Sequence, residues 1–112
     1  MSLSREQRIF TKHISELIEF AYSLDIELTF GDAFRTPEQQ KIYYDSGLSK
    51  TLNSQHNKRL AVDFNFFING QLVYEKEKLE CLGIFWETLD DKNRWGGHFK
   101  NFIDTPHFER KG

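Results

Sequence analysis

The sequence predicts an α+β fold in which helices pack on a small antiparallel sheet. Three observations predict this class. Apolar residues recur at helical spacing in the first segment, apolar and polar residues alternate in shorter segments, and Asn69-Gly70 is the dipeptide preferred in two-residue β-hairpin turns. The chain has 112 residues, without repeats or a linker, so a single domain is expected.

The first two elements are an amphipathic helix and a short strand. We expect the helix over Arg5–Leu24, with Ser4 as its N-cap, because its apolar residues fall on one face. Ile26–Phe30 alternates apolar and polar residues and is expected to form the strand. The apolar face of the helix consists of Phe10, Ile14, Leu17, Ile18 and Ala21.

A start signal for a second helix follows the first strand. Thr36 is a good capping residue, and Pro37 suits the first helical position because no backbone N–H is needed there. The helix is expected to run to about Ser46, where Gly47 ends it. A loop rich in Ser, Thr, Asn and Lys then extends to His56.

The second half of the chain contains a hairpin, a helix and a last strand. Leu60–Ile68 is the strongest strand candidate, and the turn at Asn69-Gly70 returns the chain into a partner strand over Gly70–Tyr74. We expect a third helix over Glu75–Leu89 and a final strand over His107–Glu109.

Composition excludes several partners and locations. The formal charge is −2 and the isoelectric point about 6.1, so nucleic acid, which selects a basic excess, is not an expected partner. No apolar run approaches the ~20 residues that span a bilayer, so membrane insertion is not expected. Without a signal-peptide pattern, synthesis in the cytoplasm is expected. The single cysteine, Cys81, excludes an intrachain disulfide and is expected to be a small buried hydrophobe. A monomer is expected.

Histidine and acidic residues make a candidate metal site. His56 precedes a predicted strand that carries Asp63, and His107 lies on the last strand. Imidazole nitrogens and a carboxylate oxygen are usual ligands of catalytic zinc, and three ligands leave a fourth position open. Asp104 stands where a general base is needed, and Glu109 shares a strand face with His107. Residue types alone favour the ordinary alternatives, which are a solvated histidine, an aspartate at a strand edge and a turn role for Asp104.

Three ordered motifs resemble those of a known family. They are F-R-T-P-E-Q-Q, S-x-H-x6-D and W-G-G-x-F-x4-D-x-P-H-F. Over roughly residues 30–109 the chain resembles the VanY-like zinc peptidases that cut bacterial cell-wall peptides. This family includes D-alanyl-D-alanine carboxypeptidases and the L-alanyl-D-glutamate endopeptidases of phage endolysins. The matching residues are Arg35, Gln40, Ser54, His56, Ala61, Val62, Asp63, Trp95, Gly96, Gly97, Phe99, Asp104, Pro106, His107 and Phe108.

The resemblance implies a hedgehog-type zinc peptidase fold, with residues 1–112 as one catalytic domain. It further implies one Zn2+ per chain, held by His56, Asp63 and His107, with Asp104 as the general base. Many relatives have glycine three residues after the first histidine, where Arg59 stands in this chain. The first ligand loop is therefore expected to differ in shape.

Four further residues are candidates for binding substrate or supporting the ligands. Arg35 is the best candidate to clamp a substrate carboxylate through paired hydrogen bonds, and its alternative is a surface ion pair with Glu38. Gln40 shapes the same wall or faces solvent. The candidate roles of Ser54 are to bind substrate, to orient the first ligand or to cap the loop. His98 follows two glycines, which indicate close backbone approach, and it is a candidate to support a ligand or the transition state.

The leading functional hypothesis is an L-alanyl-D-glutamate endopeptidase of phage or prophage origin that hydrolyses peptidoglycan stem peptides. Such an enzyme would act on the cell wall after release from the cytoplasm. The first alternative is a D-alanyl-D-alanine carboxypeptidase or dipeptidase with the same metal and base. The second is a non-catalytic zinc-containing binding module, against which the base beside the last ligand counts.

Overall fold

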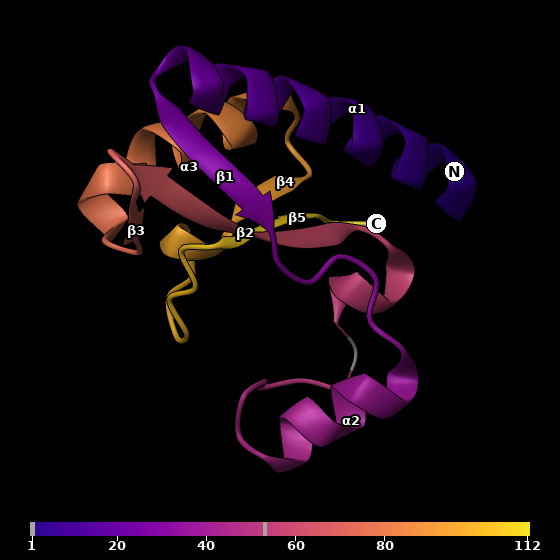
Figure 1. The fold of residues 1–112 in the computed structure, drawn as a ribbon. Helices are drawn as coiled ribbons and strands as arrows, with labels where there is room; N and C mark the ends of the chain where they lie inside the picture. Colours follow the sequence, from indigo (N-terminus) through magenta and orange to yellow (C-terminus); the bar gives the residue numbers. More distant parts are fainter. Residues whose placement is uncertain (1, 53) are drawn as a thin grey trace.

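The computed structural model describes residues 2–52 and 54–112, and it has the expected α+β architecture of helices on an antiparallel sheet. Figure 1 shows the elements in space. In chain order they are α1 (Leu3–Ser23), β1 (Ile26–Phe30), α2 (Pro37–Asp45), the 3-10 helix η1 (Gln55–Lys58), β2 (Ala61–Ile68), β3 (Gln71–Val73), α3 (Lys76–Leu89), β4 (Asn93–Trp95), the 3-10 helix η2 (Gly96–His98) and β5 (His107–Arg110).

The long strand β2 organises the sheet. Its neighbours follow the order β1-β2-β5-β4, β3 pairs with the end of β2, and all these pairings are antiparallel. The register places Asp63 opposite His107 and Ala61 opposite Glu109. Residues far apart in the sequence therefore become cross-strand neighbours at the start of β2.

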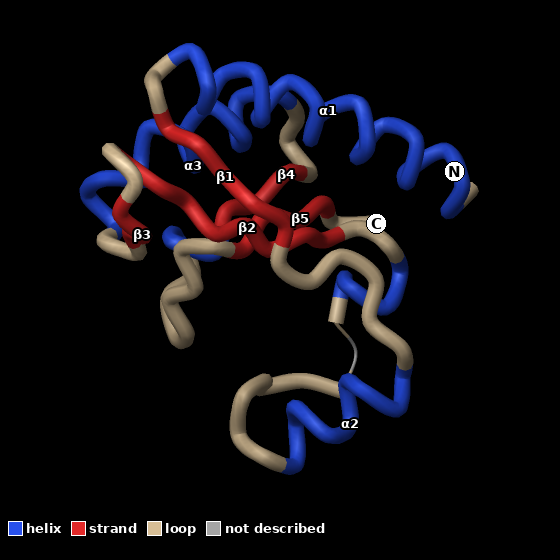
Figure 2. The backbone as a smooth tube through the Cα atoms, in the orientation of Figure 1, coloured by secondary structure: helices blue, strands red, loops and turns tan. Residues whose placement is uncertain are grey.

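Two layers enclose the core. Helices α1 and α3 lie together on one side of the sheet, whereas α2 lies on the other side (Figures 1 and 2). Alternate residues of β2 are buried, as period-two geometry requires, and the intervening Asp63 and Asn65 are half-buried on the opposite face. The core is largely aromatic and aliphatic, and its largest members are Trp86, Trp95, Phe64, Phe66 and Phe108.

Most predicted boundaries agree with the structure to within two residues, and the hairpin is confirmed. Asn69 and Gly70 have φ angles of 53° and 78°, the positive values that this turn requires. The first helix begins earlier than predicted, because Ser2 rather than Ser4 accepts the capping hydrogen bond from the backbone N–H of Arg5. The short strand β4 had no predicted counterpart.

The expectation of a buried Cys81 is wrong. Cys81 is exposed on α3. The buried side of this helix is formed by Leu79, Leu82 and Trp86, which recur at helical spacing. Position 81 falls on the outer side of that helix, although its neighbours in the sequence are apolar.

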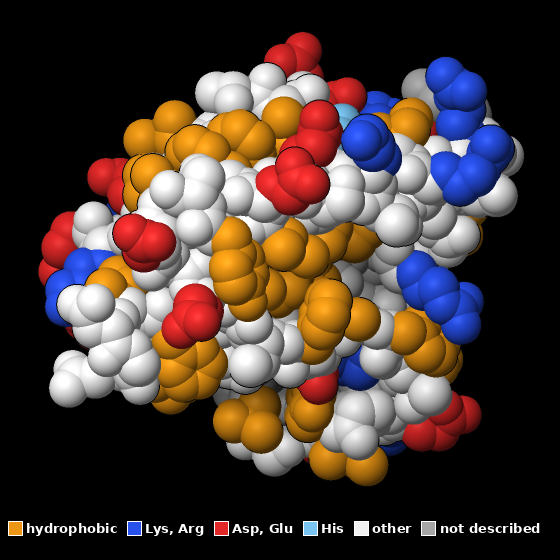
Figure 3. All heavy atoms as spheres, turned by 45° about the horizontal axis from the view of Figure 1, so that its top comes forward, with side chains coloured by type: hydrophobic (Ala, Val, Ile, Leu, Met, Phe, Trp, Pro, Cys, Tyr) orange, Lys and Arg blue, Asp and Glu red, His pale blue; other side chains and the backbone are white. Residues whose placement is uncertain are grey.

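The surface has local features that the composition does not reveal. Basic side chains gather at the N-terminal end of α1 in Figure 3, where Arg5, Arg8 and Lys12 occupy the first turns. Between α1 and β1 lies an apolar depression lined by residues that include Phe10 and Phe30. Among the helices described, none is both long and apolar enough to cross a membrane.

Candidate metal centre

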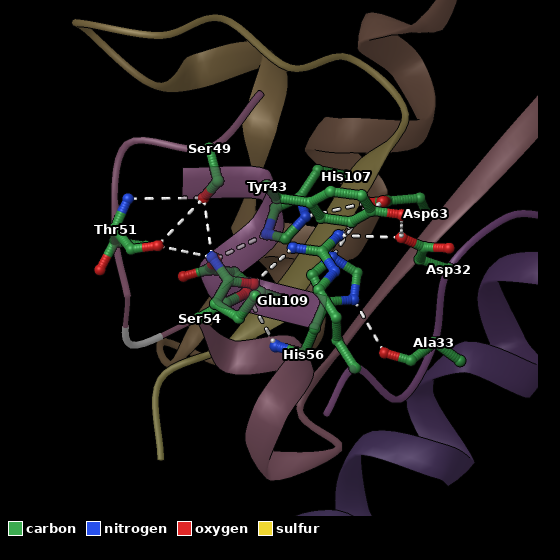
Figure 4. Close-up of polar contacts among 12 residues, drawn as sticks. Asp32, Ala33, Tyr43, Ser49, Thr51, Ser54, His56, Asp63, His107 and Glu109 are labelled. Carbon is green, nitrogen blue, oxygen red and sulfur yellow. Dashed lines mark hydrogen bonds and ion pairs between the residues drawn. The ribbon is translucent and has the colours of Figure 1, made fainter. Parts of the chain in front are cut away.

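Pairing of β2 with β5 brings two of the predicted ligands together. Asp63 and His107 lie opposite each other, and Nδ1 of His107 is 3.0 Å from Oδ1 of Asp63. His56 joins them from η1, with its Nε2 3.3 Å from the same carboxylate oxygen. One potential ligand atom of each residue lies within 4.8 Å of the others. Figure 4 shows these three side chains pointing toward one another.

A local capping arrangement fixes η1 and therefore His56. Ser54 caps this short helix, and its hydroxyl oxygen accepts a hydrogen bond from the backbone N–H of His56. Asn57 completes the capping box through its side-chain oxygen, which accepts from the backbone N–H of Ser54. Of the roles open to Ser54, loop capping is the one seen, and the residue also lines the cleft beside the ligands.

The outer nitrogen of each histidine has an acceptor. Nδ1 of His56 lies 2.8 Å from the carbonyl oxygen of Ala33, and Nε2 of His107 lies 2.7 Å from Oε1 of Glu109. Because both acceptors are oxygens without a proton to donate, each outer nitrogen is assigned the N–H. The two rings then direct Nε2 of His56 and Nδ1 of His107 toward Asp63.

The three side chains fit a divalent metal ion. Nε2 of His56 is buried yet has no hydrogen-bond partner among the described residues, which is costly unless something binds it. Two imidazole nitrogens and one carboxylate oxygen are a donor set suited to zinc and related ions. Among the described residues, His56, Asp63 and His107 are the only group with this metal-binding geometry.

The electrostatics of the cluster couple Asp63 to both rings. Burial by itself raises the pKa of the Asp63 carboxyl, but the neighbouring His107 and His56 rings more than offset this and hold it well below its usual range. Burial lowers the pKa of His107, whereas hydrogen bonds to Asp63 and Glu109 raise it more, from 6.5 to about 9. The side chains alone therefore favour an ionised carboxylate beside a protonated ring.

Asp104 faces the same cleft from the loop before β5. Its backbone oxygen accepts from the N–H of His107 and its backbone N–H donates to Gly96, so the main chain forms the turn. Its carboxylate accepts no hydrogen bond from the described residues and is thus not used to organise that turn. Burial raises the pKa of Asp104, against a lowering by His107. A carboxylate in this setting is suited to accept a proton.

The two glycines of the W-G-G motif serve protein packing. A Cβ atom on Gly96 would lie 2.1 Å from the backbone oxygen of Asp104, and one on Gly97 would lie 2.3 Å from the Trp95 ring. The close backbone approach expected from the sequence is therefore made to Asp104 and Trp95. Gly96 therefore lets η2 lie close to the Asp104 backbone and to the side chain of His107.

His98 is not brought into the cluster. It lies on the surface, where its Nδ1 is 2.8 Å from Glu87 and its Nε2 is 3.2 Å from Glu80, both on α3. Its ring meets the edge of Trp95. Because Glu87 also accepts from the backbone N–H of Trp95, this group ties η2 to α3. His98 therefore does not contact the predicted ligands in the described part of the chain, and the expectation that it supports one of them directly is wrong.

Arg35 lies beside the ligands and is engaged internally. Its guanidinium donates to Gln40 at 2.8 Å and to Asp32 at 3.2 Å, and it stands 3.6 Å from Asp63. The predicted alternative, an ion pair with Glu38, is wrong, because the carboxylates beside Arg35 are those of Asp32 and Asp63. Its side chain is 10% exposed. Arg35 therefore reaches the cleft as an ordered cation.

Gln40 is fully buried rather than solvent-facing. Its amide nitrogen donates to the Ser49 hydroxyl and to the backbone oxygen of Thr51, while its amide oxygen accepts from Arg35. Gln40 therefore links α2 and the loop that follows it to Arg35, and shapes the wall of the cleft from behind.

The ligands and Asp104 share one cleft of about 560 Å³. The loop after α2 supplies one wall and the segment around η2 the other, and Lys50 of the first lies over the Phe102 ring of the second at 5.8 Å. The lining includes Arg35, Tyr43, Lys50, Ser54, His56, Asp63, Arg94, Phe99, Phe102, Asp104, His107 and Glu109.

Sequence reasoning missed Asp32. Its carboxylate accepts from Arg35 and Tyr43, and its backbone oxygen accepts from the backbone N–H of Asp63. A signal was present in the sequence, because Asp32 stands three residues before Arg35. Arg94 was also missed, because the strand β4 that carries it was not predicted.

The departure at Arg59 has a local explanation. Arg59 ends η1 with a φ angle of 58°, a left-handed conformation in which glycine is unstrained, as the glycine expected in relatives would be. Its guanidinium lies 4.1 Å from the centre of the Phe34 ring. The loop thus keeps a glycine-like backbone while carrying a side chain outward from the ligands.

Comparison with known proteins identifies similar chains. A family model described as D-alanyl-D-alanine carboxypeptidase matches residues 47–110, which contain His56, Asp63, Asp104 and His107. The L-alanyl-D-glutamate peptidase of Listeria phage A118 is 31% identical over 98 residues, covering 84% of this chain and 34% of the phage protein. The chain therefore spans about a third of the length of that relative.

The fold has a counterpart among solved structures. The crystal structure of ChiX, an L-Ala D-Glu endopeptidase of Serratia marcescens, superposes with a TM-score of 0.65. The match covers 77% of this chain and 68% of that protein, at 23% sequence identity. This similarity supports a shared fold.

Proposed function

The chain belongs to the D-alanyl-D-alanine carboxypeptidase family, and we propose that it is a zinc-dependent peptidase of bacterial peptidoglycan stem peptides. The most specific form of the proposal is cleavage between L-alanine and D-glutamate, the activity named for the phage relative. In this proposal residues 1–112 act as a monomeric catalytic domain on the cell wall, after release from the cytoplasm.

One observation carries the proposal. Ligand atoms of His56, Asp63 and His107 lie within 4.8 Å of one another, and the uncommitted carboxylate of Asp104 lines the same cleft. A purely structural zinc site closes its coordination with a fourth protein ligand and needs no base. Three ligands beside a free carboxylate favour a catalytic site over a binding module.

His56, Asp63 and His107 would hold the zinc ion. The chemistry that such an ion supplies is Lewis acidity, which acidifies water and polarises a peptide carbonyl group. Zinc suits the donor set of two imidazole nitrogens and one carboxylate oxygen. Because the part of the chain that the structure describes gives the buried Nε2 of His56 no hydrogen-bond partner, an ion bound there would also satisfy that atom.

Asp104 would move the proton of hydrolysis. Its carboxylate accepts a proton from the attacking water as the carbon–oxygen bond forms, and returns it to the amine nitrogen as the peptide bond breaks. The products are one carboxylic acid and one amine. Burial favours this exchange, because it raises the pKa of Asp104 and makes the carboxylate a stronger base.

Arg35 would orient the substrate. It lines the cleft beside Asp63, with Gln40 and Asp32 fixing the plane of its guanidinium. A fixed guanidinium can bind a stem-peptide carboxylate or carbonyl oxygen with little loss of side-chain entropy. Gln40 and Ser54 would support this wall through their contacts with Arg35 and with η1.

Digestion of purified peptidoglycan tests the proposal. We expect fragments with a new N-terminal D-glutamate and with L-alanine left on the sugar-linked side, identified by mass spectrometry. Asp104→Asn is the matched control, because it retains the ligands and removes the base. Failure of the zinc-loaded protein to cut walls of several bacterial chemotypes would contradict the peptidase proposal.

A second candidate is D-alanyl-D-alanine carboxypeptidase activity, which the description of the matching family favours. The same digestion separates the two, since this activity releases free D-alanine and leaves the L-alanine bond intact. Zinc binding without any hydrolysis would instead favour a non-catalytic binding module.

A further inference from the structure

The two ligand histidines are held by different kinds of partner. The outer nitrogen of His56 meets a main-chain carbonyl, whereas that of His107 meets the side-chain carboxylate of Glu109 at 2.7 Å. The backbone carbonyl group of Ala33 would remain if that residue were substituted. The support of His107, by contrast, depends on one side chain that a substitution can remove.

We propose that Glu109 is a positioning residue for the metal, and that Arg94 holds Glu109 in place. By accepting from Nε2 of His107, Glu109 keeps the proton on that nitrogen and directs the Nδ1 lone pair toward Asp63. This inference rests on the proposed function only in taking His56, Asp63 and His107 as the zinc ligands.

The geometry of β4 and β5 supports this assignment. Arg94 and Glu109 are opposite each other in the register, and Nη1 of Arg94 is 3.8 Å from Oε2 of Glu109. The other oxygen, Oε1, is left for His107. The side chain of Glu109 is 12% exposed, so its charge needs partners, and these two supply them.

An aromatic ring completes the support. Phe99 lies against the His107 ring with 5.7 Å between centres, and the guanidinium of Arg94 lies 4.7 Å from the centre of Phe99. Arg94 therefore contacts both neighbours of His107, the carboxylate at the edge of the ring and the phenyl group against it. This arrangement restricts rotation of the ring that carries Nδ1.

Carboxylates behind ligand histidines have a measurable effect. They fix the tautomer and raise the basicity of the ligand, and their removal typically weakens metal binding by roughly 10–100-fold. Glu109→Ala is expected to show a loss in this range. Glu109→Gln, which keeps a neutral acceptor oxygen, is expected to lose less. Arg94→Gln is expected to lose less again, because the partly exposed Arg94 acts on His107 indirectly, through Glu109 and Phe99.

Zinc affinity, measured by competition with a chromogenic chelator, tests the order of these variants. The matched control is Glu80→Gln, which changes another glutamate–histidine contact, the one with His98 outside the cleft. We expect the control to bind zinc as wild type does. Wild-type zinc affinity in Glu109→Ala would overturn the inference, even if the protein hydrolyses peptidoglycan as proposed.

A tautomer measurement separates positioning from general loss of structure. In zinc-loaded protein with 15N-labelled histidine, NMR should place the ring proton of His107 on Nε2 and that of His56 on Nδ1. In Glu109→Ala the His107 proton should exchange faster with solvent, while that of His56 stays protected. A His107 proton on Nδ1 in the wild type would refute the assignment. A wild-type protein that binds no zinc would refute both this inference and the proposed function.

Discussion

Strand β5 contributes to two clusters of buried charged groups, one on each of its faces, and the two clusters differ in the groups that compose them. His107 and Glu109 point into the cleft, whereas Phe108 and Arg110 point to the opposite side. On that side Arg110 donates to Glu6 of α1 at 3.2 Å, and Lys92 donates to the same oxygen at 2.8 Å. The chain itself thus supplies both signs of charge in this ion cluster.

The metal cluster, formed by His56, Asp63 and His107, has a different composition. Asp63 faces two imidazoles, and the buried Nε2 of His56 has no hydrogen-bond partner among the described residues. In the ion cluster, Asp90 stands 3.3 Å from Arg110, so two carboxylates face two cations, although Oε2 of Glu6 and Nη1 of Arg110 also lack a hydrogen-bond partner among the described residues. The difference is one of chemistry: the ion cluster joins α1 to the end of the chain by pairing opposite charges, whereas the metal cluster offers two imidazole nitrogens and a carboxylate oxygen, a donor set for a metal ion. Substitutions in the two should therefore affect different properties.

The largest expected effect on activity comes from removing a ligand. His107→Ala should lose bound zinc, from about one ion per chain, and should reduce hydrolysis to the background of the assay. Metal content by atomic emission and peptidoglycan digestion measure the two effects. His98→Ala is the control and should keep its zinc, because the polar and ring contacts of His98 among the described residues are with α3 and Trp95, away from the ligands. Full activity in His107→Ala would show that His107 is not a zinc ligand.

Removing the base should separate catalysis from metal binding. Asp104→Asn preserves shape and should retain zinc, while turnover falls roughly 10²-fold or more. Steady-state kinetics on a soluble stem peptide should show the loss in kcat. Near-wild-type turnover would mean that Asp104 serves the loop alone.

A substitution in the ion cluster should lower the stability of the protein while zinc binding and activity are retained. Glu6→Gln removes the buried carboxylate that faces both Arg110 and Lys92 and leaves Arg110 only the more exposed Asp90, so the melting temperature should fall by several degrees. Zinc content and activity at room temperature should be retained, because Glu6 lies on the side of β5 away from the cleft. Calorimetry with and without zinc measures the change. Loss of zinc without loss of stability would contradict the proposed separation of the two clusters.

The stability of metal-free protein should depend on pH through His107. Its pKa in the folded chain is raised to about 9, so the folded state binds the proton more tightly than the unfolded state does. This contribution is complete below about 6.5 and is lost as the pH rises through about 9. Urea unfolding in the presence of chelator should show the decline, and His107→Ala should remove it. Zinc-loaded protein should lack this slope because Nδ1 is then a ligand.

The smallest effect is expected at a surface ion pair far from both clusters. Lys41 and Asp45 pair at 2.8 Å on α2, where both side chains are more than half exposed. Water and salt screen such a pair, so Asp45→Asn should change the melting temperature very little. A loss as large as that of Glu6→Gln would show that burial is not what distinguishes the ion cluster.

The sequence by itself determined the local structure and the types of residue in the site. The hairpin at Asn69-Gly70, the cap of α2 at Thr36 and the alternation along β2 follow from short-range patterns, and the structure has each of them. Alternation also placed Asp63 on the face of β2 opposite the core. Local rules suffice for these features because each depends on neighbours a few residues away.

Tertiary structure decided which side chains meet. The pairing of Asp63 with His107 depends on the register between two strands, and the partners of Arg35 depend on how the segment after β1 places it between Gln40 of α2 and Asp63 of β2. The sequence pattern contains neither, because both arise from long-range contacts. For the same reason Cys81 is exposed and His98 contacts α3, although each lies in a segment that suggested otherwise.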